Sequence, residues 1–190
     1  MRIIAGEFKG RRIQAPRTRA VRPTTDRVKK TIFDVLATRI DFEGIRVLDL
    51  FAGSGTLGLE ALSRGASHVT FVDASVESLR IIEANLKALH AESRGKLLHA
   101  NAELVISQLK EPFDLVFVDP PYAYNALEAL PIKLASIVGA GSWMIMKHPS
   151  KVQLLSSSTY CGTIPGFRFI ITKHFGETSV TFFHLEQNTE

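Results

Sequence analysis

The stretch "VLDLFAGSGTLGLEAL", residues 47–62, decides the fold of this chain. A short apolar segment leads into glycines at positions 53, 55 and 58, and an apolar helical pattern follows directly. This G-x-G-x-x-G spacing between a strand and a helix is typical of nucleotide-binding α/β proteins, although a tight packing turn could use the same glycines. The rest of the sequence therefore has to decide between a ligand site and a purely structural turn.

The same rhythm of strand, turn and helix continues along the chain. Apolar strands separated by helical patterns predict a Rossmann-like α/β fold, with a mostly parallel sheet covered by helices on both faces. "FGET", residues 175–178, joins the last two strands by a tight glycine turn, so the sheet should end in an antiparallel hairpin. We expect strands over 46–50, 68–72, 96–100, 113–118, 142–147, 168–173 and 179–185, and helices over 55–64, 75–90, 102–109, 125–138 and 150–156.

The start of the chain follows a different pattern. "RIIAGEFKGRRIQAP", residues 2–16, predicts a small β-hairpin over 2–5 and 11–14, followed by a proline-containing linker. Thr25 or Asp26 can cap a helix that runs to about Ile40. We therefore expect a basic arm and linker over residues 1–23 and one α/β domain over residues 24–190.

Positive charge is concentrated in this arm. The whole chain carries a net charge of +4, yet residues 1–30 hold ten Lys and Arg against two acids, which is +8. The remainder is therefore mildly acidic, at −4. A basic arm on an acidic body indicates a polyanionic partner, and nucleic acid is the commonest. A solvated arm that only promotes solubility is the alternative.

Cysteine and histidine usage argues against a metal site. The single cysteine, Cys161, excludes a disulfide framework or a cysteine cluster, and the six histidines lack ligand-like spacing. We expect no metal, no membrane-spanning segment and no N-terminal signal peptide, because residues 2–12 lack an apolar core. A reducing, cytoplasmic location is the simplest expectation.

Acidic residues at the strand ends favour a ligand site. Asp49 lies inside the first strand, and Asp73 ends the second, about 20 residues beyond the glycines, where an acid can bind ribose hydroxyls. A carboxylate at Asp49 would repel a pyrophosphate but attract an ammonium and a sulfonium. S-adenosylmethionine carries both cations as well as a ribose. In "HANAEL", Asn101 and Ala102 would border the adenine, and Asn101 could also cap a helix.

The fourth strand ends in a rigid tip, "DPPY", residues 119–122. Asp119 and a backbone carbonyl could accept the two hydrogens of an exocyclic amine, which would direct its lone pair toward a methyl donor. Pro120 and Pro121 fix the direction of the carbonyls, and Tyr122 offers a flat face for a base. An ordinary strand-ending turn is the alternative. The tip is expected at the same sheet edge as the glycine loop, so we favour an amino-methyltransferase.

These motifs closely resemble the bacterial 16S ribosomal RNA guanine-N2 methyltransferases of the RsmD type. The resemblance covers nearly the whole chain and rests on "MRIIAGEFKGRRI" (1–13), "RPTTDRVKKTIFDVL" (22–36), "LDLFAGSGTLGLEALSRGA" (48–66), "FVDPPY" (117–122) and "HFGETSVTFF" (174–183). It implies a class I methyltransferase fold with a seven-stranded sheet and S-adenosylmethionine as cofactor. The acceptor would be N2 of one guanine of 16S rRNA in an assembled or nearly assembled small subunit.

The resemblance also implies site residues. The donor site would comprise Asp49, Phe51, Gly53, Gly55, Thr56, Asp73, Ala74, Asn101, Ala102 and Asp119, and the catalytic residues would be Asp119, Pro120, Pro121 and Tyr122. RNA would contact Lys9, Arg11, Arg12, Arg17, Arg19, Arg22, Thr24 and Arg27, with the segment 22–27 covering the pocket. The protein would act as a monomer. Relatives often carry an acid near Lys147, where this chain has "MIMKHPS", which implies different RNA contacts there.

Three other functions remain open on the sequence alone. The tip would serve an adenine-N6 methyltransferase of DNA or RNA equally well, and the basic arm does not separate the two because it reads phosphates. A nicotinamide-dependent oxidoreductase shares the glycine pattern, but Asp49 and the lack of a second substrate domain argue against it. A non-catalytic RNA-binding subunit would need Asp119 only for packing.

Overall fold

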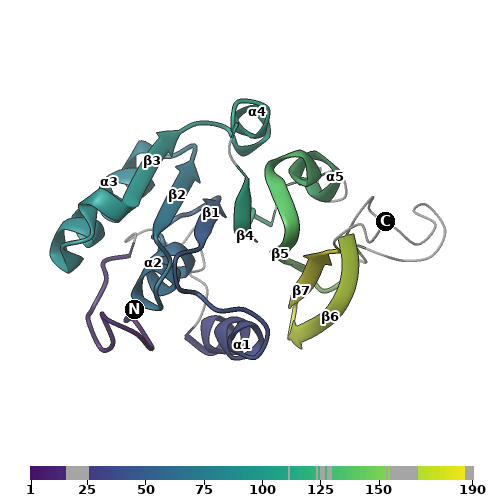
Figure 1. Cartoon of the computed structure of the whole chain (residues 1–190), viewed down its shortest axis with the longest axis horizontal. Coiled ribbons are helices and arrows are strands. Elements are labelled where there is room, and N and C mark those ends of the chain that lie inside the picture. Colours follow the sequence, from purple (N-terminus) through teal and green to yellow (C-terminus); the bar gives the residue numbers. More distant parts are fainter. Residues whose placement is uncertain are drawn as a thin grey trace.

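The computed structural model describes residues 1–15, 26–110, 112–122, 124, 127, 130–152, 154 and 167–186. Its centre is one seven-stranded sheet with the strand order β3-β2-β1-β4-β5-β7-β6 (Figure 1). The strands are β1 (Arg46–Leu50), β2 (His68–Asp73), β3 (Gly95–His99), β4 (Phe113–Val118), β5 (Val138–Pro149), β6 (Phe167–Phe175) and β7 (Thr178–Leu185).

The sheet is mixed in the way the sequence predicts. Neighbouring strands from β3 to β5 pair in parallel, whereas β7 pairs antiparallel with both β5 and β6. A two-residue turn joins β6 to β7, and its Gly176 takes a left-handed φ of 64°, which glycine adopts without steric cost. The predicted Rossmann-like sheet with a C-terminal antiparallel hairpin is confirmed.

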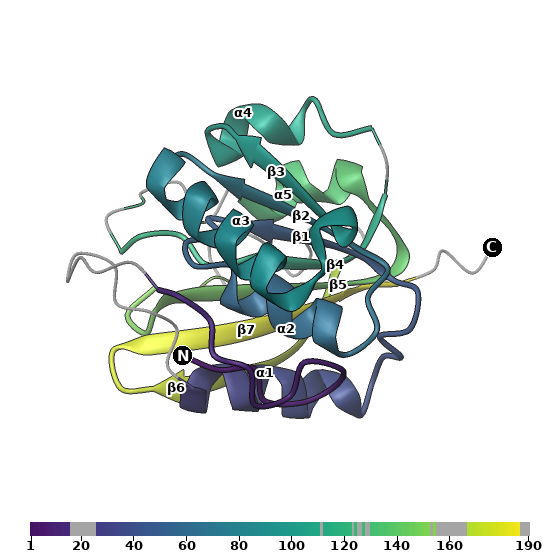
Figure 2. The same ribbon diagram turned by 90° about the vertical axis from the view of Figure 1, so that its left-hand side faces the viewer.

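Helices cover both faces of the sheet (Figures 1 and 2). One face packs on α1 (Asp26–Ala37), α2 (Thr56–Ser63) and α3 (Val76–Leu89), whereas the other packs on α4 (Ala102–Ile106) and α5 (Leu130–Leu134). Successive strand residues alternate between these faces. Thus Val47 and Phe117 belong to the first core, and Leu48 and Val118 to the second.

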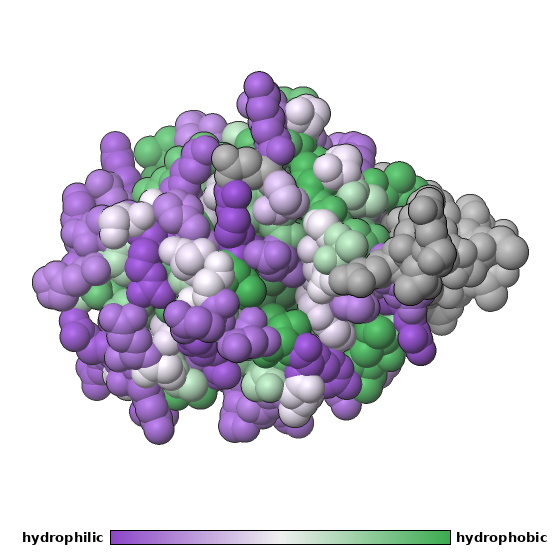
Figure 3. All heavy atoms as spheres, viewed as in Figure 1, coloured by the Kyte–Doolittle hydropathy of each residue, from purple (hydrophilic) through white to green (hydrophobic). Residues whose placement is uncertain are grey.

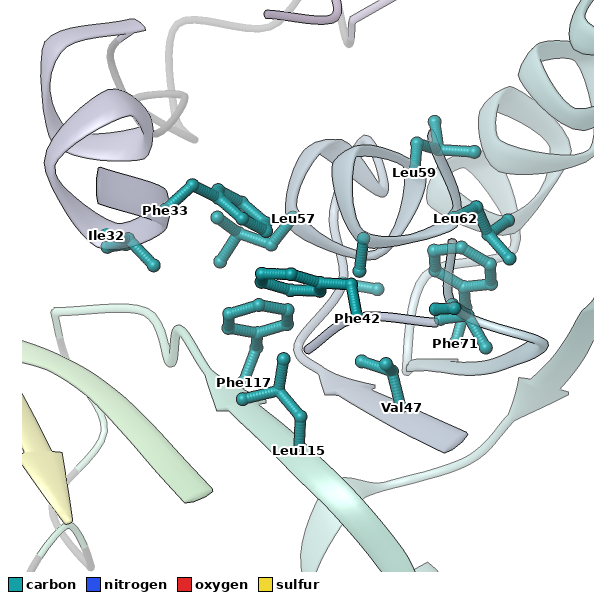
Figure 4. Packing of buried hydrophobic residues seen from close by; sticks show 14 of the residues in the cluster. Ile32, Phe33, Phe42, Val47, Leu57, Leu59, Leu62, Phe71, Leu115 and Phe117 are labelled. Carbon is teal, nitrogen blue, oxygen red and sulfur yellow. The ribbon is translucent and has the colours of Figure 1, made fainter. Parts of the chain in front are cut away.

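The first core fixes α1 against the middle of the sheet. The Phe33 ring lies 5.7 Å from the Phe117 ring on β4 and 5.7 Å from the Phe42 ring (Figure 4). Phe33 and Phe117 are fully buried, and α1 shows the amphipathic spacing that predicts its position. This packing places the first turn of α1 near the glycine loop that follows β1.

Element ends differ from the predictions in several places. β5 is longer than expected, and α4 is shorter than the predicted helix over 102–109. α5 lies within the predicted helix over 125–138, part of which falls outside the described residues. Two short 3-10 helices, Glu92–Arg94 and Ala135–Ile137, were not predicted, because one tight turn leaves little periodicity. In the predicted helix over 150–156, residues 150–152 and 154 are not helical, and residues 153, 155 and 156 lie outside the described part of the chain.

The N-terminal segment, residues 1–15, forms a minimal hairpin rather than two full strands. Its one bridge pairs Arg2 with Arg12, because the segment is bound along α2 instead of to a second strand. Ile3, Phe8 and Ile13 are buried in the same core as α1 and α2. The boundary at residue 23 stays a prediction, since residues 16–25 lie outside the described part of the chain.

A buried charged network attaches this segment to the domain. The Glu60 carboxylate on α2 accepts hydrogen bonds from the backbone N–H groups of Ile4 and Ala5, at 2.8 and 3.0 Å. Lys29 on α1 donates to the Arg2 carbonyl at 2.6 Å and lies 3.7 Å from Glu60. Both side chains are fully buried, so this network joins three segments far apart in sequence.

Candidate active site

The glycine loop leaves β1 by a sharp left-handed path. Phe51, Gly53 and Gly55 all have positive φ, at 58°, 56° and 72°. The Gly55 N–H donates to the Ala52 carbonyl at 2.7 Å, and Gly55 forms the N-cap of α2. The loop therefore presents the positive end of α2 at the carboxyl edge of the sheet.

Two glycines of the motif are needed for different physical reasons. A Cβ on Gly58 would lie 2.3 Å from the Phe71 ring, so this glycine allows α2 to pack closely on β2. A Cβ on Gly53 would meet no atom closer than 3.9 Å, so the backbone there is open to a ligand. The packing explanation of the motif is thus correct for Gly58, whereas Gly53 leaves room for a bound molecule.

Asp49 is buried directly beneath this loop. Its carboxylate accepts the Gly58 N–H at 3.0 Å, and the side chain is almost fully shielded from solvent. Burial raises the pKa of Asp49 well above its ordinary value, and the nearby charges of Asp119 and Asp73 raise it further. A cationic ligand would relieve this unfavourable concentration of acids.

Asp73 holds the other side of the loop. Its two carboxylate oxygens accept the backbone N–H groups of Gly53 and Ser75, both at 2.8 Å. Each oxygen keeps a lone pair for a further donor, such as a ribose hydroxyl. The acid therefore orients the glycine loop and still offers acceptors to a ligand.

The predicted adenine side lies next to Asp73. The Ala100 N–H donates to the Asp73 carbonyl at 3.2 Å, which brings the end of β3 beside the end of β2. Asn101 caps α4, since its side chain accepts the Glu103 N–H at 2.8 Å, and Ala102 is buried behind it. Ala74 is exposed at this edge. The capping role of Asn101 is confirmed, and its adenine contact stays a prediction.

The proline tip lies directly beside the glycine loop. The Asp119 N–H points to the Leu50 carbonyl at 3.4 Å, and the ring of Tyr124 meets the Phe51 ring edge-on at 5.3 Å. Tyr124 also donates its backbone N–H to the Pro121 carbonyl at 2.9 Å. The loop and the tip, some 65 residues apart in sequence, thus form one site.

Tyr122 faces outward at the end of the tip. Its ring is 52% exposed, and its hydroxyl is hydrogen-bonded to the Thr178 hydroxyl on β7. The C-terminal hairpin therefore fixes an exposed aromatic face next to Asp119. An exposed, anchored ring of this kind suits stacking against a flat base.

Three polar contacts at this site were not predicted from the sequence. The Lys147 ammonium lies 2.7 and 3.0 Å from the two oxygens of Asp119. Behind the tip, the Tyr124 hydroxyl donates to Glu103 at 2.5 Å, and Lys133 also binds Glu103, at 2.8 Å. Burial and then this carboxylate raise the pKa of Tyr124. The lysine contact depends on strand register, which no local pattern reveals.

The predicted RNA-binding residues occupy two different places. Arg12 and Arg27 are exposed near the first turns of α2 and α1, close to the site. Lys9 and Arg11 are also exposed, but they flank a turn bound at Ser63, the last residue of α2, and the Arg11 guanidinium binds the Ala88 carbonyl at 2.6 Å. Arg17, Arg19, Arg22 and Thr24 lie outside the described residues.

Other kinds of site find no support among the described residues. Within that part of the chain, no group of three or more histidine, cysteine, aspartate or glutamate side chains could hold a metal ion. No described helix is long and apolar enough to cross a bilayer. Hydrophilic side chains cover much of the half of the surface that carries α3 and β3 (Figure 3).

The strand order and the loop at the carboxyl edge define a class I methyltransferase fold. The solved structure described as "Putative methyltransferase yhhF from Escherichia coli" is 29% identical, with a TM-score of 0.82 over 98% of both chains. The protein SMU.776, described as a putative methyltransferase complexed with SAH, has the same fold at 14% identity, with a TM-score of 0.66 over 82% of this chain and 49% of that one.

Residues 1–184 match the family described as "Conserved hypothetical protein 95", and the chain belongs to that family. The Escherichia coli (strain K12) protein named ribosomal RNA small subunit methyltransferase D is 41% identical over 128 residues, which are 67% of this chain and 63% of that protein. Its Haemophilus influenzae namesake is 36% identical over 76% of this chain and 73% of that protein. The resemblance to RsmD-type proteins is confirmed.

Proposed function

We propose that this protein transfers a methyl group from S-adenosylmethionine to the exocyclic N2 of a guanine in 16S rRNA of the small ribosomal subunit. The observation that carries the proposal is the contact between the glycine loop and the proline tip, through Phe51 with Tyr124 and Leu50 with Asp119. Relatives named for small-subunit rRNA methylation support the choice of substrate.

The residues of the loop fit a cationic nucleoside donor. Asp73 and Asp119 lie close enough to Asp49 for their charges to raise its pKa, and the backbone at Gly53 has room for a ligand. S-adenosylmethionine, when bound, would supply the electrophilic methyl group on a positively charged sulfur. Asp73 would accept the ribose hydroxyls, and Asp49 would stabilise the cationic end of the donor.

Asp119 and the prolines would orient the attacking amine. The nitrogen forms a bond to the methyl carbon as the carbon–sulfur bond breaks, so the sulfur leaves as a neutral thioether. Asp119 and a carbonyl of the tip would each accept one N–H, which directs the nitrogen lone pair along the line of attack. The surplus proton on the methylated nitrogen then leaves through the carboxylate or to water.

Methyl transfer to purified subunits tests this proposal. Small ribosomal subunits from a bacterial strain lacking this gene would be incubated with labelled S-adenosylmethionine and the protein, and their RNA digested to nucleosides. We expect N2-methylguanosine from one position in 16S rRNA. N6-methyladenosine as the sole product would establish the adenine alternative. Binding of a nicotinamide dinucleotide without S-adenosylhomocysteine binding would establish the oxidoreductase alternative.

A further inference from the structure

Lys147 is bound to the carboxylate of the proposed catalytic residue. Its ammonium lies 2.7 and 3.0 Å from the two Asp119 oxygens, and the two side chains are only 16% and 18% exposed. Val118 on β4 pairs with Met146 on β5, so the next residues of the two strands, Asp119 and Lys147, lie side by side at the sheet edge. Strand register therefore fixes this ion pair within the site.

The strand that anchors the aromatic tip also pairs with the strand of Lys147. In the sheet, Lys147 is the register partner of Val180 on β7. The Tyr122 hydroxyl reaches the same strand at Thr178, two residues from Val180. Lys147 and the anchor of the tip are therefore held by the same strand. Any base that reaches Asp119 must also approach Lys147.

The carboxylate can bind a base and the lysine together once the ammonium moves to one side. The ammonium bridges both oxygens of Asp119, so it faces the two lone pairs that parallel N–H groups of a base would use. Each oxygen has a second, outer lone pair. When a base binds both oxygens, the ammonium can keep one hydrogen bond at an outer lone pair, and there it would lie beside the next atom along the same base edge. Because ammonium is only a donor, that atom must be an acceptor.

We propose that Lys147 is a specificity-determining residue that contacts O6 of the target guanine, while Asp119 accepts its N2–H and N1–H. This inference rests on the proposed function. Two acceptors followed by a donor complement the donor, donor, acceptor order of the guanine edge. Adenine offers one donor and then an acceptor, so one carboxylate oxygen would face the lone pair of adenine N1, and this repulsion disfavours adenine.

Two substitutions test the contact. Lys147→Met removes the donor at similar length, and Lys147→Arg keeps a charged donor. We expect Lys147→Met to lower kcat/KM for small subunits by about 10- to 100-fold, the range for a hydrogen bond to a charged group. Lys147→Arg should retain more activity. Calorimetry should still detect S-adenosylhomocysteine in both variants, because the contacts of Asp73 with the glycine loop are left in place.

A substrate with a weaker acceptor at position 6 separates base reading from mere neutralisation of Asp119. The target guanine, once located, would be replaced by 6-thioguanine, which keeps the N2 amine and N1–H and has sulfur, a weaker acceptor, in place of O6. We expect the original protein to lose activity on this substrate, and Lys147→Met to lose little more than it already has, because the two changes affect the same hydrogen bond. The inference would be overturned if the activity losses from the Lys147→Met change and from the changed base multiplied, because the two changes would then act independently. Full activity of Lys147→Met on guanine would also overturn it.

Failure of this inference differs from failure of the proposed function. If the protein methylates no guanine in small subunits, the proposed function is wrong and Lys147 has no guanine to read. If guanine is methylated and the two losses are independent, the function stands and the role of Lys147 in base recognition is wrong.

Discussion

Asp119 illustrates how single residues define the chemistry of this site. Its backbone is anchored to the end of β1, its carboxylate binds Lys147, and its charge acts on Asp49. If residues 119–122 were only a strand-ending turn, these contacts would not need to lie beside the glycine loop. At this scale the decisive evidence is which groups share one sheet edge.

Replacing Asp119 should separate binding from catalysis. Asp119→Ala removes the acceptor for the amine but leaves the contacts of Asp73 and the glycine loop in place. We expect methyl transfer to fall by about 100-fold or more, the range for a positioned polar group. Calorimetry should still detect S-adenosylhomocysteine. Full transfer activity in Asp119→Ala would contradict the mechanism and favour a non-catalytic RNA-binding subunit.

Asp49 should make donor binding depend on pH. Its pKa is raised in the ligand-free protein, so its contribution to stability is complete below the ordinary carboxyl pKa and is lost as the pH rises through the raised value. A bound cation favours the ionised carboxylate and therefore expels the proton. S-adenosylmethionine affinity should rise with pH, by up to about tenfold per unit, until the ligand-free pKa is passed.

Asp49→Asn supplies the control for this pH effect. The amide cannot ionise, so its S-adenosylmethionine affinity should be lower at high pH and nearly independent of pH. Calorimetry in two buffers with different heats of ionisation would show proton release for the original protein alone. The same pH dependence in both proteins would assign the proton to another group.

At the scale of elements, α1 and α2 are joined by the buried pair of Lys29 and Glu60. Lys29 also donates to the Thr56 hydroxyl, at 3.2 Å, in the first turn of α2. Burial lowers the pKa of Lys29, while the neighbouring Glu60 opposes that shift. The pair therefore holds α1, α2 and the N-terminal segment in one arrangement.

Breaking this pair should be costly. Lys29→Met removes a buried donor to the Arg2 carbonyl and one of the two cations of Glu60, which keeps Arg64 at 3.0 Å. We expect a loss of about 1–3 kcal/mol in the free energy of unfolding. Lys30→Met is the matched control, because Lys30 binds Asp34 at 2.6 Å on the exposed face of the same helix. That change should cost about 0–1 kcal/mol. If urea unfolding showed the same loss of free energy for Lys29→Met and Lys30→Met, burial would add nothing to the stability that the Lys29 contacts provide.

The sequence predicts the order of the elements, and the sheet edge at which its motifs meet, much better than it predicts element ends. The G-x-G-x-x-G turn, Asp73 and the DPPY tip each follow a strand, so the rule that parallel strands end at one edge brings them together. Short α4 and α5 carry too few turns for their periodicity to set an end. The contacts of Lys147 with Asp119, and of Tyr122 with Thr178, depend on tertiary register and were beyond sequence reasoning.

At the scale of the whole molecule, the N-terminal segment runs from one end of α2 to the other. The Arg2 and Arg12 pair lies at the start of α2, since Lys29 reaches both the Arg2 carbonyl and Thr56. The turn between them is bound at Ser63, where a Cβ on Gly6 would lie 1.7 Å from the Ser63 carbonyl oxygen. Its basic residues are therefore not equivalent with respect to the site.

This placement predicts unequal roles in RNA binding. Substitution of Arg12 and Arg27 with alanine should flatten the salt dependence of small-subunit binding, by about 0.7–0.9 in log–log slope for each phosphate that is no longer neutralised. The pair Lys9→Ala and Arg11→Ala removes the same charge at the far end of α2 and should change the slope less. Filter binding over a salt series would compare the slopes of the two double variants. A larger change for Lys9→Ala with Arg11→Ala would mean that the RNA lies over the Ser63 end of α2.

The insertion of β7 between β5 and β6 has a consequence for synthesis of the chain. Thr178 anchors the aromatic tip, although it follows Tyr122 by 56 residues in the chain. A nascent polypeptide whose β7 is still held in the ribosomal tunnel has to leave β5 as an open edge, with its tip unsupported. The tip is therefore anchored only after β7 has emerged, and a product terminated before β7 would expose a strand prone to aggregation.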